Sequence, residues 1–239
     1  MSEAPIDPPS SKLGTKAHWD DVYSTEIDNF ETIGDEGEIW FGEDSMEKMV
    51  DWVVDNIPKD PNPSILEVGS GNGALLFALV EAGFNPDRIC GVDYSEHAVS
   101  LAKAISSSKD IEGADHVTFA VCDFLSNFPA PLHEVPDASQ RNPDVWDLVL
   151  DKGTFDAMAL MEKDASGGSP SDSYPSRIVQ VVKPGGYFLI VSCNFTEDEL
   201  RKKFEAVGLE FNSRIEFPSF SFGGKSGNVY SGVAFHKPN

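Results

Sequence analysis

The stretch "SILEVGSGNGALL", residues 64–76, joins an apolar strand to an apolar helix through a turn that contains three glycines. A glycine-rich turn at such a junction directs backbone N–H groups at a ligand beside the helix N-terminus. The turn also fits the loose dinucleotide fingerprint G-x-G-x-x-G/A, so the glycines alone do not identify the ligand. The residues around the turn must therefore show whether the ligand is a nucleotide phosphate or a molecule that only resembles a nucleotide.

Strand-like and helix-like segments alternate outward from this turn. We predict strands at 64–68, 88–94, 116–124, 146–151, 187–192, 209–217 and 228–235, and helices at 18–30, 44–57, 74–83, 95–108, 176–183 and 196–207. Asp44 and Ser95 are the predicted N-caps of two of these helices, and "TEDE" is a capping box. No helix separates the last two strands, which is typical of an antiparallel hairpin. The pattern predicts a parallel α/β sheet that ends in such a hairpin.

The composition and net charge of the chain indicate which kinds of molecule it can bind. The chain has 239 residues, of which 18 are basic and 40 acidic, and its net charge is -22. A field of that sign repels nucleic acid and attracts a basic protein surface, although solubility alone also explains it. The three cysteines and five histidines lack metal-ligand spacing, which predicts no metal site and a reduced, intracellular protein. No apolar run approaches the roughly 18 residues of a membrane span, so we expect no membrane partner.

Three acidic residues stand at the ends of three successive predicted strands. Glu67 precedes the first glycine by two residues, where it would repel a pyrophosphate but attract an ammonium or sulfonium group. Asp93 stands where a carboxylate binds ribose hydroxyls, and Asp123 can reach an adenine amino group while Phe124 flanks the ring. Each acid alone is more often a cap or turn residue. Together they favour a ligand with an amino group, a ribose and an adenine but no phosphate, which is S-adenosylmethionine.

The motifs "LEVGSGNG", "GVDYS", "CDF" and "VKPGGYFLIVS" stand in the order found in class I S-adenosylmethionine-dependent methyltransferases, which residues 45–239 resemble. This resemblance implies a Rossmann-like fold with a seven-stranded, mostly parallel sheet, a C-terminal antiparallel hairpin and helices on both faces. It also implies which residues contact the cofactor. Asp93 and Tyr94 would contact the ribose, and Asp123 and Phe124 the adenine. The methionine end would be contacted by Glu67, Gly69, Ser70, Gly71 and Gly73.

A narrower resemblance covers residues 17–235. The segments "HWDDVYSTEIDNF", "GDEGEIWFGEDSM", "DLVLDKGTFDAM", "SCNFT" and "FSFGGKSGN" resemble the eukaryotic lysine methyltransferases that modify translation elongation factor 1-alpha, in their small single-domain branch (Efm-four type, lysine methyltransferase 2 in animals). The resemblance implies a protein-lysine N-methyltransferase. We further expect a monomer in the cytoplasm, with the nucleus as a second compartment. The alternatives are a different protein or small-molecule acceptor, a dinucleotide-dependent reductase and a non-catalytic binding module. Glu67, Asp123 and the terminal hairpin argue against the reductase.

The sequence divides into a tail and one domain. Residues 1–16 are acidic and rich in proline and serine, which predicts a disordered tail. We expect residues 17–239 to form a single methyltransferase domain, with a helical cap at 17–60 and a cofactor-binding core at 61–239. The polar segments 126–145 and 162–175 are predicted insertions.

The segment "DLVLDKGTFDAM" places Asp151 at the end of a buried strand. Enzymes that methylate the exocyclic amines of bases carry Asn/Asp-Pro-Pro-aromatic at this place, and the missing prolines argue against a nucleic-acid acceptor. Two interpretations of Asp151 remain open. Its carboxylate either positions the incoming amine or accepts backbone N–H groups at the strand end. We expect Phe155 and Asp156 to begin the next helix rather than to touch the substrate.

Only a neutral amine attacks a methyl sulfonium, and the pKa of a lysine side chain in water is near 10.4. Desolvation beneath aromatic side chains lowers that pKa. We predict that Trp40 and Phe41 form such a lid. For Trp19 and Tyr23 the favoured interpretation is packing of the first helix on the sheet.

Overall fold

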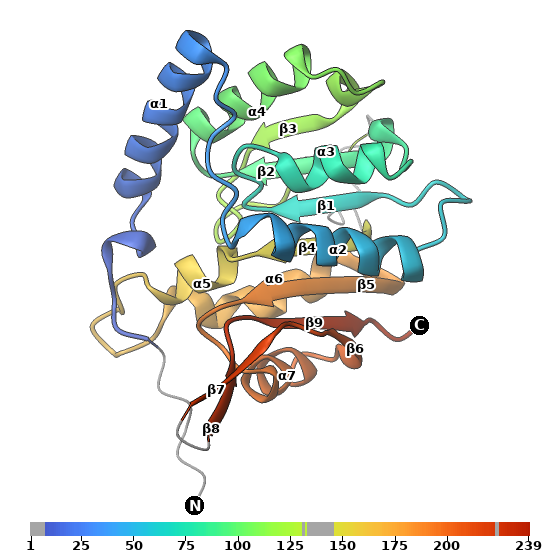
Figure 1. Cartoon of the computed structure of the whole chain (residues 1–239). Coiled ribbons are helices and arrows are strands. Elements are labelled where there is room, and N and C mark those ends of the chain that lie inside the picture. Colours follow the sequence, from blue (N-terminus) through green and yellow to red (C-terminus); the bar gives the residue numbers. More distant parts are fainter. Residues whose placement is uncertain (1–7, 131, 133–145, 223–224) are drawn as a thin grey trace, which may run out of the picture.

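A seven-stranded sheet forms the centre of the structure, a computed structural model that describes residues 8–130, 132, 146–222 and 225–239. The strand order is β3-β2-β1-β4-β5-β9-β6 (Figure 1). The strands are β1 Ile65–Val68, β2 Ile89–Asp93, β3 Thr118–Val121, β4 Trp146–Lys152, β5 Val182–Ser192, β6 Glu210–Ile215 and β9 Ser231–His236. β9 runs antiparallel to β5 and β6, and the remaining pairs are parallel. The predicted fold class and the terminal antiparallel pair are confirmed.

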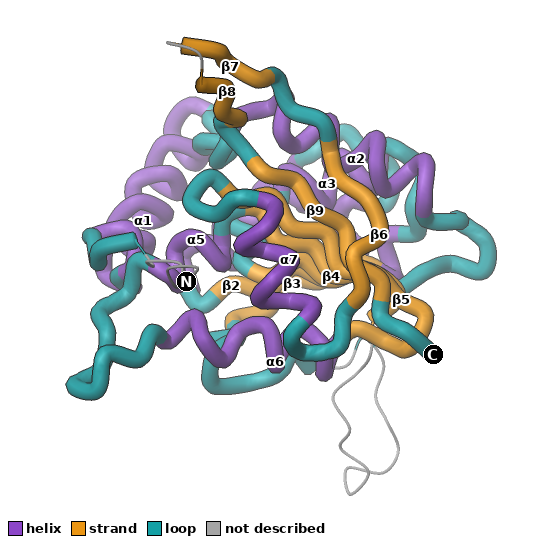
Figure 2. Tube along the Cα trace, turned by 90° about the horizontal axis from the view of Figure 1, so that it is seen from below, coloured by secondary structure: helices purple, strands orange, loops and turns teal. Residues whose placement is uncertain are grey.

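Helices cover both faces of this sheet (Figure 2). They are α1 Lys16–Ile33, α2 Gly42–Asn56, α3 Ala74–Glu81, α4 Glu96–Ser108, α5 Thr154–Ala159, α6 Tyr174–Val181 and α7 Glu197–Glu205. One apolar cluster joins α2, α3 and α4 to the sheet, and the other joins α5, α6 and α7 to the opposite face. Because both faces are covered, β1 is buried at every position, with Ile65 in the first cluster and Leu66 in the second. Among the described residues, every helix is too short or too polar to cross a membrane.

The two predicted helix N-caps, Asp44 and Ser95, differ from the structure. α2 begins at Gly42, and its N-cap is Phe41, whose φ is +66°. Asp44 is therefore not the N-cap but lies in the first turn, where its charge still suits the helix dipole. Ser95 does occupy the N-cap position of α4, but its hydroxyl donates a hydrogen bond to Asp20 in α1 instead of accepting one from the helix.

The sequence predicted no strand between 209–217 and 228–235, and the structure differs there. This segment contains the strands β7 Ser219–Phe222 and β8 Lys225–Asn228, which pair antiparallel as a separate two-stranded sheet. Its many glycines and serines conceal the strand pattern, since the backbone pairing does not depend on an apolar face.

The N-terminal helix α1 stands across the end of the sheet at which the parallel strands end (Figure 1). Its Asp20 accepts the Ser95 hydroxyl at 2.7 Å, and the indole N–H of Trp19 donates to the Leu13 carbonyl at 2.7 Å. Residues 12–14 of the predicted tail form a 3-10 helix, and the Ser11 N–H donates to the Leu160 carbonyl at 3.0 Å. Residues 1–7 of the tail and 133–145 of the first insertion lie outside the described residues.

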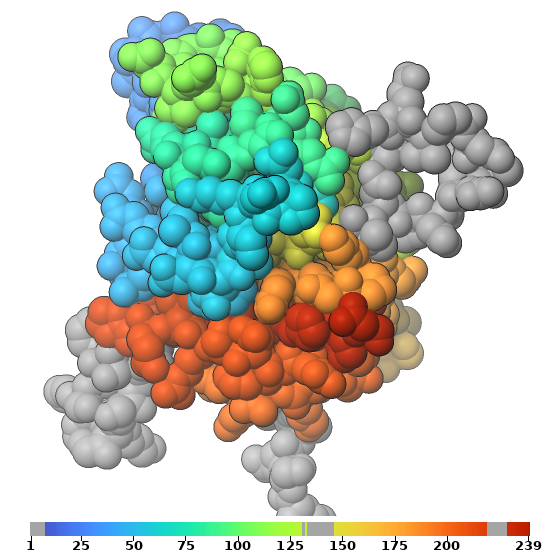
Figure 3. Space-filling view, turned by 90° about the vertical axis from the view of Figure 1, so that its right-hand side faces the viewer, coloured from blue at the N-terminus to red at the C-terminus, as the bar shows by residue number. Residues whose placement is uncertain are grey.

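α2, which covers one face of the sheet, also contacts the edge strand β6. Figure 3 shows the α2 segment next to the β6 segment. The Trp52 indole N–H donates to Ser213 Oγ at 2.9 Å, which ties the two elements together.

Candidate functional site

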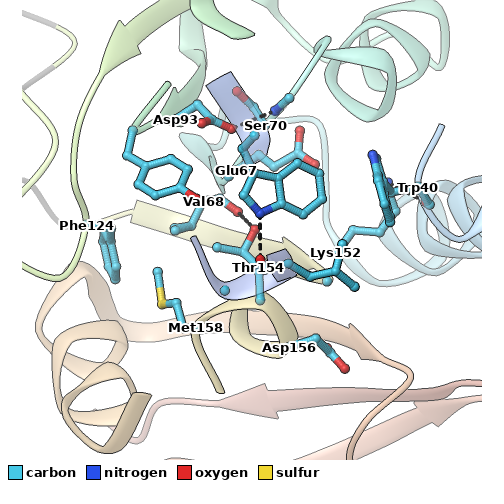
Figure 4. A pocket seen from close by; sticks show the side chains of 18 of the residues that line it. Trp40, Glu67, Val68, Ser70, Asp93, Phe124, Lys152, Thr154, Asp156 and Met158 are labelled. Atoms are coloured by element: carbon cyan, nitrogen blue, oxygen red, sulfur yellow. Dashed lines mark hydrogen bonds between the residues drawn. The ribbon is translucent and has the colours of Figure 1, made fainter. Parts of the chain in front are cut away.

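A pocket of about 490 Å³ lies at the carboxyl end of the parallel strands, beneath α1 (Figure 4). Its walls come from the ends of β1, β2 and β4, from the turns after them, and from α1 and the segment before α2. Open parallel sheets bind ligands at this edge. All of the sequence-predicted cofactor residues except Gly73 line it, namely Glu67, Gly69, Ser70, Gly71, Asp93, Tyr94, Asp123 and Phe124.

The glycine turn follows β1 and is closely packed. Gly69, Gly71 and Gly73 have φ values of +70°, +52° and +81°, which L side chains rarely adopt. A Cβ at Gly69 would lie 2.0 Å from Thr154 Oγ1, a hydroxyl that donates to the Val68 carbonyl at 2.8 Å (Figure 4). Glycine is thus needed both for the backbone conformation and for the close approach of the β4–α5 junction.

Glu67 is the penultimate residue of β1, at the mouth of this turn, and is 2% exposed. Its Oε2 has no hydrogen-bond partner among the described residues. Burial raises the pKa of Glu67, and the neighbouring Lys152 ammonium partly opposes that rise. Buried polar atoms are normally paired, so a free carboxylate oxygen at the pocket is suited to a ligand ammonium group.

Asp93 ends β2 and faces the glycine turn. Its Oδ2 accepts the Gly71 N–H at 3.1 Å and its Oδ1 accepts the Ser95 N–H at 2.9 Å. Burial raises the pKa of Asp93 to about 6. Each carboxylate oxygen keeps a second lone pair, so the group can also accept two ligand hydroxyls.

Asp123 and Phe124 lie just beyond the end of β3. The Asp123 carboxylate accepts the Leu125 N–H at 3.1 Å and the Ser126 hydroxyl at 2.7 Å, and the side chain is exposed. The Phe124 ring is buried and meets Tyr174 edge-on, with centroids 5.5 Å apart. This arrangement offers a flat apolar wall beside a polar rim, which suits an aromatic heterocycle with an exocyclic amine.

Aromatic side chains from the first helix and the segment before α2 form the facing wall. Trp19, Tyr23, Trp40 and Phe41 all line the pocket. Trp19 meets Trp40 edge-on at 4.7 Å and stacks on Tyr23 at 6.1 Å between ring centroids. Lys152 ties this wall to β4, because its Nζ donates to the Trp40 carbonyl at 2.8 Å. Trp19 and Tyr23 therefore pack against the core and border the pocket at once.

Asp151 does not line the pocket. It is 0% exposed, and its carboxylate accepts the Thr154 N–H at 2.8 Å, the Phe155 N–H at 3.0 Å and the Tyr174 hydroxyl at 2.5 Å. These contacts hold the first turn of α5 and a neighbouring helix, so the structure favours the second interpretation, a strand-end acid that accepts backbone N–H groups. The predicted role in positioning the acceptor has no support in this geometry.

Several pocket residues, from α5 and the turn after β5, were not predicted from the sequence. Asp156, Met158, Cys193 and Asn194 line the pocket beside Lys152. Phe155 and Asp156 lie in the first turn of α5, as predicted. The same prediction kept both residues away from the substrate, whereas Asp156 lines the pocket. The motif "SCNFT" marked the second segment in the sequence, but nothing in it indicated contact with residue 156.

Comparisons with known proteins agree with this arrangement. A family model described as a methyltransferase domain matches residues 59–226. Among solved structures, magnesium protoporphyrin IX methyltransferase from Synechocystis with bound S-adenosylmethionine superposes with a TM-score of 0.61 at 16% identity, covering 99% of this chain and 100% of that one. A putative methyltransferase in complex with the Haloferax volcanii Trm112 activator gives 0.57 at 17% identity, covering 92% and 98%. At such identities the likeness shows the fold.

Relatives of known activity are much more similar in sequence. Protein-lysine N-methyltransferase efm4 of Schizosaccharomyces pombe is 39% identical over 95% of this chain and 94% of its own. Protein-lysine N-methyltransferase EFM4 of Saccharomyces cerevisiae is 37% identical over 96% of each chain. EEF1A lysine methyltransferase 2 of Homo sapiens is 39% identical over 95% of this chain and 87% of its own. The chain therefore belongs to the class I methyltransferases, and within them to the family of protein-lysine N-methyltransferases that contains EFM4 and EEF1A lysine methyltransferase 2.

Proposed function

We propose that this protein transfers a methyl group from S-adenosylmethionine to a lysine side chain of translation elongation factor 1-alpha. The observation that carries the proposal is the near full-length similarity, at 37–39% identity, to relatives named for protein-lysine and EEF1A lysine methylation. The net charge of -22 supports a basic protein partner and argues against nucleic acid. A monomer in the cytoplasm, with the nucleus as a second compartment, remains part of this proposal.

The pocket residues fit the cofactor. When bound, S-adenosylmethionine supplies a methyl group activated by its sulfonium. The unpaired Oε2 of Glu67 would accept the methionine ammonium, and the turn from Gly69 to Gly73 would surround the methionine end. Asp93, with Tyr94 beside it, would accept the ribose hydroxyls, and Asp123 and Phe124 would border the adenine. Calorimetry should detect binding of S-adenosylmethionine but not of NAD, and binding of NAD alone would exclude this assignment.

The aromatic wall explains how a lysine could react at neutral pH. Trp40 and Phe41 border the pocket beside Lys152 and would exclude water from an amine that enters there. Removal of water disfavours the charged ammonium and lowers its pKa. The protein then contributes mainly proximity and alignment between the neutral amine and the methyl group.

The direct test is mass spectrometry of purified, folded elongation factor 1-alpha after incubation with the enzyme and S-adenosylmethionine. We expect added mass in steps of one methyl group on a lysine. Heat-denatured enzyme and a reaction without cofactor serve as controls. Added mass on arginine or histidine, or no added mass on the factor, would contradict the proposed acceptor.

We expect kcat/KM for the folded factor to fall by at least about tenfold between about 0.05 M and about 0.5 M salt, because charge-assisted encounter is screened as the Debye length shortens. Steady-state kinetics measure this effect. A peptide that carries the target lysine should be a poorer substrate with a weaker salt dependence, since most of the charged surface is missing from it. Equal salt dependence for peptide and folded factor would show that the acidic field does not guide encounter.

Cofactor affinity should weaken as the pH falls from about 7 to about 5. Ligand hydroxyls bind the Asp93 carboxylate, whose pKa of about 6 in the free protein means that protonation competes with binding below this pH. The dissociation constant should rise by up to about tenfold for each pH unit below the pKa. Calorimetry on the wild type and on Asp93→Asn measures this, and the Asn variant should bind weakly at both pH values. A variant that keeps the wild-type pH dependence would place the titrating group elsewhere.

A further inference from the structure

Five carboxylates line the pocket: Glu38, Glu67, Asp93, Asp123 and Asp156. The proposed function assigns Glu67, Asp93 and Asp123 to the cofactor. Glu38 is exposed to a larger extent, whereas Asp156 is only 4% exposed. Asp156 is therefore the buried carboxylate of the pocket to which the proposed cofactor contacts assign no role.

The two oxygens of Asp156 have different surroundings. Oδ1 accepts three hydrogen bonds from the turn after β5, at 2.9 Å from Ser192 Oγ, 3.0 Å from the Cys193 N–H and 2.6 Å from the Asn194 N–H. Oδ2 is buried and has no hydrogen-bond partner in the described part of the chain. Burial, together with the charge and hydrogen bonding of Asp156, raises the pKa of the nearby Cys193 thiol to about 12. This thiol donates to Asn194 Oδ1 at 3.7 Å, and a thiol is only a weak donor. One oxygen anchors the turn and the other remains free for a ligand.

The charge of this carboxylate is not balanced by a cation from the described residues. Among them Asp156 forms no ion pair, and burial raises its pKa. Lys152 is a partly buried cation of the pocket, but it interacts with Glu67 and donates to the Trp40 carbonyl. In the view of Figure 4 Lys152 lies between Glu67 and Asp156. The cofactor ammonium and the acceptor amine can thus each have a separate carboxylate.

We propose that Oδ2 of Asp156 accepts a hydrogen bond from the ζ-amine of the substrate lysine and directs its lone pair at the methyl group. This inference rests on the proposed function. The lysine ammonium first loses a proton to water. The nitrogen lone pair then forms the N–C bond as the C–S bond breaks, positive charge passes from sulfur to nitrogen, and S-adenosylhomocysteine is released. The Asp156 carboxylate stabilises the charge that develops on the nitrogen.

The test is Asp156→Asn, which keeps an oxygen for the turn but replaces the free oxygen by an amide NH₂. We expect kcat/KM for the folded factor to fall about 10- to 100-fold, the effect of losing a hydrogen bond to a charged group. The cofactor dissociation constant, measured by calorimetry, should change less than about twofold. A variant with wild-type kcat/KM would overturn the proposal, as would one that loses cofactor affinity to the same extent as activity.

Ser192→Ala separates positioning of the substrate from anchoring of the turn. It removes one donor to Oδ1, together with an acceptor of the Asn194 and Phe195 N–H groups in the same turn, and leaves the charge of Asp156 in place. If Asp156 only anchors the turn, Ser192→Ala should cost more activity than Asp156→Asn, and our proposal requires the reverse order. Asp147→Asn, which removes a carboxylate at the far end of β4 beside Ser64, is the matched control and should keep wild-type kcat/KM.

A binding cycle gives a readout that does not depend on turnover. The methylated lysine of the factor, once located by mass spectrometry, is replaced by methionine, and binding to enzyme loaded with S-adenosylhomocysteine is measured. The lysine-to-methionine change should weaken binding to the wild type by at least about fivefold and to Asp156→Asn by less than about twofold. Asp156→Glu, which keeps the charge, should retain part of this coupling and provides a second variant if the Asn protein does not fold. Equal losses for wild type and variants would exclude contact between Asp156 and the amine, whereas absence of lysine methylation by the wild type would instead refute the proposed function.

Discussion

Replacement of Gly69 by alanine is expected to weaken S-adenosylmethionine binding by at least about 100-fold, or about 2.7 kcal/mol. The backbone at this position has a φ of +70°, a conformation that costs an L residue about 1–2 kcal/mol. The new Cβ would also lie 2.0 Å from Thr154 Oγ1. Thr154 is held by the Val68 carbonyl, so the turn and its N–H groups must shift instead. Calorimetry with the purified variant measures the loss.

Gly208→Ala is the matched control for this prediction. Gly208 also has a positive φ, +96°, but a Cβ there meets no atom within 4 Å. The control should lose about 1 kcal/mol of stability and keep the wild-type cofactor affinity. If Gly69→Ala binds the cofactor as well as this control does, the glycine turn does not surround the methionine end.

Replacement of Asp151 by alanine is expected to lower the free energy of unfolding by about 3–5 kcal/mol, because three buried donors lose their acceptor. These donors are the N–H groups of Thr154 and Phe155 and the hydroxyl of Tyr174. Urea unfolding followed by circular dichroism measures the change. Stability, and not only turnover, should be affected, since the carboxylate holds α5 against the core.

Asp151→Asn provides the control. Its amide oxygen can accept the α5 N–H groups while its NH₂ faces Tyr174, so we expect a loss of about 1 kcal/mol. Burial raises the pKa of Asp151 to about 7, above its value in the unfolded chain. The protonated form is therefore favoured by folding, and this group lowers stability as the pH rises from about 4 to about 7; in Asp151→Asn that contribution should vanish. An Ala variant with wild-type stability but much reduced turnover would restore the acceptor-positioning interpretation.

The strands and most helices could be predicted from the sequence because their signals are local. The apolar runs of β1 and β2 are buried at every position, as parallel strands covered on both faces must be. The capping box of α7 is present, with Thr196 accepting the Glu199 N–H and the Glu199 carboxylate accepting the Thr196 N–H. The hairpin β7–β8 was not predicted, because the polar/apolar alternation of β7 spans only four residues and β8 contains no apolar side chain.

The sequence by itself determined the place of the pocket and the identity of the acids near it. Parallel strands end at one edge of a sheet, so Glu67, Asp93 and Asp123 had to be neighbours once the strands were recognised. Only the tertiary structure decided which acid near the end of β4 faces the pocket. Asp151 is the penultimate residue of β4 and Asp156 lies in α5 just after it. Their roles depend on partners remote in the chain, Tyr174 for the first and the Ser192 turn for the second. It also decided that α1 covers the site, through contacts such as that of Asp20 with Ser95. Local sequence patterns determine which secondary structure forms. The direction of a buried carboxylate depends instead on the hydrogen-bond donors that tertiary packing places around it.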